Sequence, residues 1–107
     1  MADLDFDLTV THEKGACRVA LRGELDLGSA EQLERALDEC GDDVLLDLRG
    51  LTFMDSTGVR VLLEAAERGA PGLRMVPPLN GDARVTIDET GIAPLLPLVG
   101  DEAEELP

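Results

Sequence analysis

The chain has 107 residues and a formal net charge of −14, from 23 acidic and nine basic side chains. Its length suits one domain with a modest core, and its 44% hydrophobic content is typical of a globular protein. It has no lysine–arginine cluster and only two aromatic residues, so it lacks the basic face and the stacking platforms that nucleic-acid binding requires. We therefore expect a single domain that binds no nucleic acid.

The sequence also bears on the cellular compartment. No apolar run approaches the ~18 residues that a membrane span needs, and the acidic N-terminus lacks the basic and apolar regions of a signal peptide. Cys17 and Cys40 both fall at positions of an apolar pattern, which favours buried free thiols over a disulfide. These features indicate a cytoplasmic protein with no membrane association.

The first segments alternate apolar and polar residues, as strands with one buried face do. The alternation runs through residues 4–10 and again through 17–22, and a turn at 12–15 joins the two into a hairpin. The aspartates of the first segment share one solvated face and lack the glycine turn of a calcium loop. We therefore expect no metal site there.

The rest of the chain alternates helical patterns with strands. The predicted elements are a helix opened by a capping box at residues 29–32, a buried strand at 44–48, a helix ending at Gly69, a short strand at 73–76, a helix at 80–89 and an edge strand at 95–99. This order predicts an α/β fold: a single compact domain over residues 1–107, with a mixed four- to five-stranded sheet that starts with a hairpin and is packed by three to four helices. Residues 100–107 form an acidic C-terminal tail.

The inventory of side chains argues against an enzyme. The only histidine, His12, falls in the hairpin turn, away from any serine or cysteine that it could activate. The segment Asp55-Ser56-Thr57-Gly58 lacks the leading glycine of a nucleophile elbow. The cysteines and the histidine have no zinc spacing, and no glycine-rich phosphate loop is present. We expect no catalytic residue, no metal and no cofactor.

Ser56 lies where the strand at 44–48 gives way to a helix, after a short connection. The first N–H groups of a helix lack intrahelical acceptors and carry partial positive charge, so a phosphate on this serine is favourable there. Arg60 lies one turn further along, close enough to sense such a charge. The alternatives are that Ser56 and Thr57 only cap the helix, and that Arg60 is an exposed arginine with no partner.

Four segments spread over nearly the whole chain carry a family resemblance. They are Gly23-Glu24-Leu25-Asp26, Val44-Leu45-Leu46-Asp47-Leu48, Phe53-Met54-Asp55-Ser56-Thr57-Gly58-Val59 and Gly91-Ile92. Together they resemble the STAS domain of bacterial anti-sigma factor antagonists. The resemblance implies a compact α/β fold with a small sheet packed by helices, and a role in partner switching.

In that family the unphosphorylated protein binds an anti-sigma factor that is itself a serine kinase, and so releases a sigma factor. The kinase then phosphorylates the serine that matches Ser56, and the complex dissociates. A metal-dependent serine phosphatase later removes the phosphate. By this resemblance Ser56 is the phosphoacceptor, its neighbours shape the loop, and the Gly-Glu-Leu-Asp segment lies near the partner surface. The resemblance implies the partner-binding residues Glu24, Asp26, Asp55, Ser56, Thr57 and Gly58. Arg60 is added to this set because it lies one turn from Ser56.

The chain departs from the family pattern in two places. Thr57 replaces the second serine of the commonest Asp-Ser-Ser-Gly form, which makes it a minor alternative acceptor, and the C-terminal helix is cut short or absent. The alternative function is a STAS scaffold subunit of a transporter or signalling complex, in which the same loop docks permanently and Ser56 is never phosphorylated. In either case we expect the free protein to be a monomer.

Overall fold

The computed structural model describes residues 6–41, 43–69, 72–79 and 81–99. The elements in chain order are β1 (Phe6–Glu13), β2 (Ala16–Leu25), α1 (Leu27–Cys40), β3 (Val44–Met54), α2 (Ser56–Gly69), β4 (Leu73–Val76) and α3 (Gly81–Thr90), followed by a 3₁₀ turn at Ala93–Leu95. The strands form one sheet in the order β1-β2-β3-β4, with β1 antiparallel to β2 and the other pairs parallel. The predicted α/β fold and its opening hairpin are confirmed.

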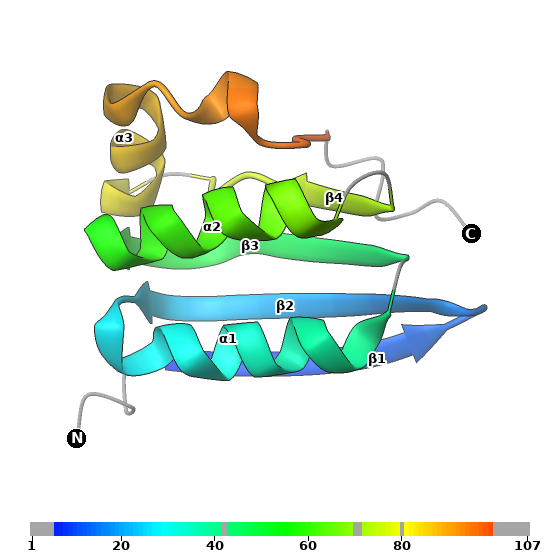
Figure 1. Ribbon diagram of the computed structural model, residues 1–107. Helices are drawn as coiled ribbons and strands as arrows, with labels where there is room; N and C mark the ends of the chain where they lie inside the picture. Colours follow the sequence, from blue (N-terminus) through cyan, green and yellow to red (C-terminus); the bar gives the residue numbers. More distant parts are fainter. Residues whose placement is uncertain (1–5, 42, 70–71, 80, 100–107) are drawn as a thin grey trace.

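Helices α1 and α2 form a layer on one face of the sheet. Figure 1 shows α1 and α2 side by side across this face, while α3 lies beside β3. β4 pairs with the first part of β3, from Val44 to Asp47. α3 contacts the far end of β3, where the hydroxyl of Thr86 donates to the carbonyl of Met54. Apolar side chains from both layers fill the space between them, led by Leu21, Leu33, Leu46, Leu48 and Leu62. The core is mostly aliphatic, with Phe6, Met54 and Met75 among its other members.

The hairpin turn has a conformation that suits its strands. Lys14 and Gly15 both have positive φ, of 53° and 84°. Two such residues in succession match the right-handed twist of the flanking strands, which is why this turn closes hairpins. The turn fixes the register of β1 on β2, in which Leu8 lies opposite Leu21.

Helix α1 begins earlier than its sequence pattern predicts. Asp26, rather than Ser29, is the N-cap, and its carboxylate accepts from the N–H groups of Gly28 at 3.0 Å and Ser29 at 3.2 Å. Ser29 completes the box from inside the helix, because its Oγ accepts from the Asp26 N–H at 3.0 Å. The capping-box prediction therefore found the right motif type but assigned the wrong residue to the N-cap.

Strands β2 and β3 are longer than the predictions of 17–22 and 44–48. Their pairing shifts register between Ala20 and Arg22 and again between Gly23 and Glu24, then continues to Leu25 opposite Met54. These irregularities break the alternation of apolar residues, which is the sequence signal for a strand. Phe53 and Met54 therefore belong to β3 and not to a connection.

The two cysteines form a disulfide, so the prediction of free thiols is wrong. The bond joins Cys17, near the start of β2, to Cys40, the last residue of α1, with their Cα atoms 5.7 Å apart. Because α1 runs back along the sheet from the end of β2, it returns the chain to where β2 began. This meeting is a property of the topology, and the spacing of two cysteines in the sequence does not reveal it.

The segment after α3 does not form the predicted edge strand. Within residues 81–99, the part of this segment that the structure describes, one isolated bridge to β4 is present, in which Met75 donates to the carbonyl of Pro97 and accepts from Val99. Proline has no N–H to donate, so a segment with Pro94 and Pro97 cannot sustain a ladder. The predicted tail at 100–107 lies outside the described residues. In the described part of the chain, every helix is too short or too polar to cross a membrane.

Candidate functional site

Ser56 is the first residue of α2 and its side chain is exposed. The preceding residue supplies the helix cap, because the Asp55 carboxylate accepts from the Gly58 N–H at 3.1 Å. The Asp55 carbonyl also accepts the first intrahelical bond, from Val59 at 3.0 Å. Capping thus falls to Asp55, and the Ser56 hydroxyl is left at the surface.

The start of α2 is fixed tightly against the sheet. The Asp55 N–H donates to the carbonyl of Leu25, the last residue of β2, at 3.3 Å. Gly58 is buried, and a Cβ at this position would lie 2.6 Å from the same carbonyl and closer still to the side chain of Met54. Only glycine lets the first turn of α2 approach the strands this closely.

The electrostatic surroundings of Ser56 are mixed. The N–H groups of Ser56 and Thr57 belong to the first turn, where backbone donors have no intrahelical acceptor and the helix dipole is positive. Asp55 adds a carboxylate beside them. Arg60, one turn along, forms an ion pair with Glu64 at 3.2 Å. The alternative that Arg60 is an exposed arginine with no partner is therefore wrong.

The structure brings the two predicted segments together. β2 and β3 are parallel neighbours that end with Leu25 opposite Met54, so the Gly-Glu-Leu-Asp segment and the Ser56 loop lie at the same edge of the sheet (Figure 1). Asp26 has a structural role here, because its carboxylate caps α1. The carbonyl of Glu24 accepts from the buried hydroxyl of Ser29 at 2.8 Å.

Two exposed apolar side chains at this edge were missed by the sequence reasoning. Leu27, the first residue of α1, is 75% exposed, and Phe53, near the end of β3, is 37% exposed. The signal for Leu27 was present in the sequence: once Asp26 is taken as the N-cap, Leu27 falls outside the apolar stripe of the helix. Exposed apolar groups and an exposed hydroxyl at the same end of the sheet are typical of a surface that another protein can cover.

Comparison with known proteins identifies the family. The family model described as Mlab, STAS domain, matches residues 8–79, which span β2, α1, β3, α2 and β4 with most of β1. The chain belongs to the STAS family. This STAS domain is similar to the anti-sigma F factor antagonist of Paenibacillus polymyxa, with 26% identity over 110 residues that cover 96% of this chain and 94% of that protein.

Solved structures agree with this assignment. A crystal structure of an anti-sigma factor antagonist from Mycobacterium paratuberculosis has a TM-score of 0.73 and 26% identity, and covers 87% of this chain and 84% of its own. SpoIIAA in its unphosphorylated form has a TM-score of 0.67 at 20% identity, over 92% of this chain and 91% of its own. Bacillus SpoIIAA in its phosphorylated form has a TM-score of 0.63 at 19% identity, over 92% of this chain and 95% of its own. The last two show the fold alone, and together the matches confirm the resemblance seen in the sequence.

Proposed function

We propose that this STAS domain is an anti-sigma factor antagonist that binds an anti-sigma factor serine kinase while Ser56 is unphosphorylated, releasing a sigma factor. Phosphorylation of Ser56 by that kinase ends the binding, and a metal-dependent serine phosphatase restores it. The observation that supports the proposal most directly is the exposed hydroxyl of Ser56 at the start of α2, which Asp55 leaves free of any capping role.

The unphosphorylated edge is suited to being covered by a partner. A neutral hydroxyl costs little to bury when the partner offers one hydrogen bond, and Leu27 and Phe53 gain from leaving water. Aromatic side chains of this kind are enriched at the centres of protein interfaces. In this proposal the partner covers Leu27 and Phe53 as apolar anchors together with Ser56.

Phosphorylation of Ser56 changes the charge of this edge. A phosphoserine carries roughly −1.5 to −2 charges near neutral pH, and a helix start accepts that charge without loss of the fold. A partner surface that had covered the neutral hydroxyl must now desolvate a dianion beside the Asp55 carboxylate. The affinity for the partner should therefore fall while the domain stays folded.

The other residues of the predicted set take supporting roles in this proposal. Thr57 is half-buried and thus a poorer acceptor than Ser56, and Gly58 holds the loop against the sheet. Arg60 and Glu24 lie on the flanks of the covered surface. The domain itself performs no catalysis: it is the substrate of the kinase and of the phosphatase.

The test is to mix the domain with a candidate anti-sigma kinase and ATP, and to follow both modification and binding. We expect one phosphate, on Ser56, by intact mass and peptide mapping. Ser56→Ala should bind the kinase persistently, and Ser56→Asp should bind at least about 30-fold more weakly, which corresponds to about 2 kcal/mol of lost binding free energy. Both variants should unfold at about the temperature of the parent, because Asp is favourable in a first helical turn.

A matched control is Thr9→Asp, which adds the same charge to an exposed residue of β1, away from the Ser56 edge. It should bind like the parent. Should Ser56→Asp also bind like the parent, and no phosphate reach Ser56, the domain would instead be a permanently docked scaffold subunit of a transporter or signalling complex.

A further inference from the structure

The sheet face opposite α1 and α2 collects arginines in a strongly acidic chain. On β2, Arg18 and Arg22 alternate with buried residues of the core face, so their side chains point to this second face. Arg49 of β3 joins them, and Arg74 of β4 lies two strands from Arg18 in the same row of the sheet. Four of the nine basic residues of a chain with net charge −14 therefore share one face.

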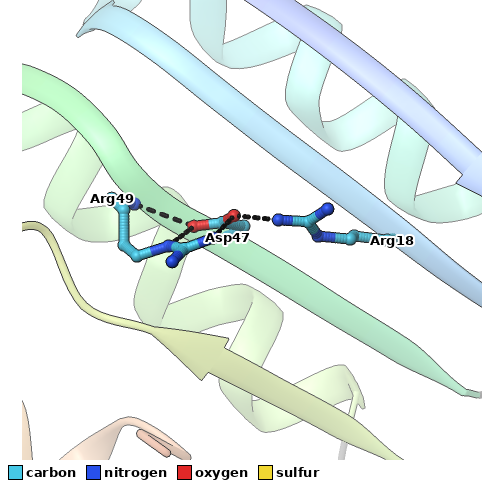
Figure 2. Close-up of polar contacts among 3 residues, drawn as sticks. All are labelled: Arg18, Asp47 and Arg49. Atoms are coloured by element: carbon cyan, nitrogen blue, oxygen red, sulfur yellow. Dashed lines mark hydrogen bonds and ion pairs between the residues drawn. The ribbon is translucent and has the colours of Figure 1, made fainter. Parts of the chain in front are cut away.

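Asp47 fixes two of these arginines in place. Its carboxylate accepts from Arg18 Nη2 at 2.6 Å, from Arg49 Nε at 3.0 Å and from Arg49 Nη2 at 2.9 Å (Figure 2). Burial would raise the pKa of Asp47, but the hydrogen bonds from Arg49 and Arg18 outweigh burial and hold that pKa below its usual value. The carboxylate stays ionised near neutral pH, so both guanidinium groups are oriented before any ligand arrives.

Arg22 completes a cationic depression on this face. The depression is lined by Arg22, Arg49, Asp47, Gly50 and Leu79 together with parts of β2. Gly50 lies opposite Arg22, and a Cβ there would lie 2.6 Å from the carbonyl of Leu21 and 2.7 Å from Arg22 Cγ, so the hollow depends on glycine. Arg22 is exposed, and within the described part of the chain its guanidinium makes no hydrogen bond or ion pair.

We propose that this depression binds the phosphate group of a small phosphorylated molecule. Arg22 and Arg49 approach it from neighbouring strands, and a phosphate has three terminal oxygens that can accept from two separate guanidinium groups. A carboxylate has two oxygens and is already matched by one arginine fork, so it uses the pair less well. Leu79, which is 58% exposed, offers an apolar contact to the organic part of the ligand.

The acidic group that opposes such a ligand is Asp7. It is exposed on β1 and lies directly opposite Arg22 in the β1–β2 register, so its charge lowers the local potential. Arg22 is nonetheless exposed and pairs with no described side chain, so its guanidinium can donate to an anion in the depression. The site lies on a different part of the sheet from Ser56, so it does not depend on the proposed switch.

The experiment is a titration with inorganic phosphate and with phenyl phosphate at constant ionic strength, followed by two-dimensional NMR of backbone amides and arginine Nε–H groups. We expect saturable shifts at Arg22, Arg49 and Gly50, with tighter binding of phenyl phosphate because of Leu79. Arg22→Gln should weaken binding about tenfold or more, since it removes the fork that no described residue engages. Asp7→Asn should tighten binding, and Arg35→Gln, on exposed α1, should leave it unchanged.

Arg22→Gln removes no described contact, so loss of the fold does not confound the result. The proposal is overturned if the shifts grow linearly without saturation, if Arg35 shifts as much as Arg22, or if Arg22→Gln binds like the parent. Equal shifts with sodium acetate would show a general anion effect and would overturn the assignment to phosphate.

Discussion

Asp47 is the only buried ionisable side chain among the described residues, with 5% of its surface exposed. It lies on β3, between Arg18 on β2 and Arg49 two residues further along, and accepts four hydrogen bonds from them, one of which comes from the Arg49 backbone. Burying a carboxylate without partners is costly, so this residue is tolerated because both of its oxygens are matched.

Replacing Asp47 by Asn should destabilise the domain by about 3 kcal/mol near neutral pH, because the carboxylate that Arg18 and Arg49 share is lost. The pKa of Asp47 is lower in the fold than in the unfolded chain, so its contribution exists above the ordinary carboxyl pKa and disappears as pH falls through the folded value. Denaturant unfolding of parent and Asp47→Asn at about pH 7 and about pH 3 measures this. The difference between them should shrink in acid, and a constant difference would contradict the charge-based explanation.

Gly58 is a second residue whose identity follows from its surroundings. Gly58→Ala places a methyl group against the Leu25 carbonyl and the Met54 side chain, and we expect a loss of about 2 kcal/mol in unfolding free energy. Glu67→Ala, at an exposed position of the same helix, is the control and should change stability little. If Gly58→Ala were as stable as this control, the close approach of α2 to the strands would be wrong.

Among the elements, α1 and β2 are joined by more than packing. The Cys17–Cys40 disulfide closes a loop over a sequence separation of 23 residues, and such a bond restricts the unfolded chain. The double variant Cys17→Ser, Cys40→Ser should lose about 3 kcal/mol relative to the oxidised parent. Reductant should lower the stability of the parent toward that of the variant and leave the variant unchanged. Two reactive thiols in the untreated folded protein would contradict the bond.

Element order was predictable because it depends on local patterns. The alternation before residue 10, the apolar run from Val44 and the stripe on α2 each reflect burial of one side of a single element. The errors arose where two elements meet. The register shifts of β2 on β3, the choice of Asp26 over Ser29 as the cap and the pairing of Cys17 with Cys40 all depend on what lies beside a residue in space.

At the scale of the whole molecule, charge is distributed unevenly between the two faces. The outer sides of α1 and α2 carry six acids against the three arginines Arg35, Arg60 and Arg68. The second face of the sheet carries four arginines against the acids Asp7 and Asp47. The six acids are Glu31, Glu34, Asp38, Glu39, Glu64 and Glu67. Net charge alone predicts a uniformly acidic surface, so the cationic depression was invisible until strand register placed Arg22 and Arg49 side by side. Ser56 was predictable because its motif is contiguous in the sequence.

The tight seating of the first turn of α2 has a consequence for signalling. The backbone around Ser56 is held by the Leu25 carbonyl and by the packing of Gly58, so a group added to the hydroxyl has little leverage to reshape the domain. Under the proposed function, the phosphorylated and unphosphorylated forms then have nearly the same conformation and differ in the charge at Ser56. The phosphate can then be added and removed repeatedly without refolding. The lifetime of the signal is set by the rates of the kinase and the phosphatase rather than by a conformational change of the domain.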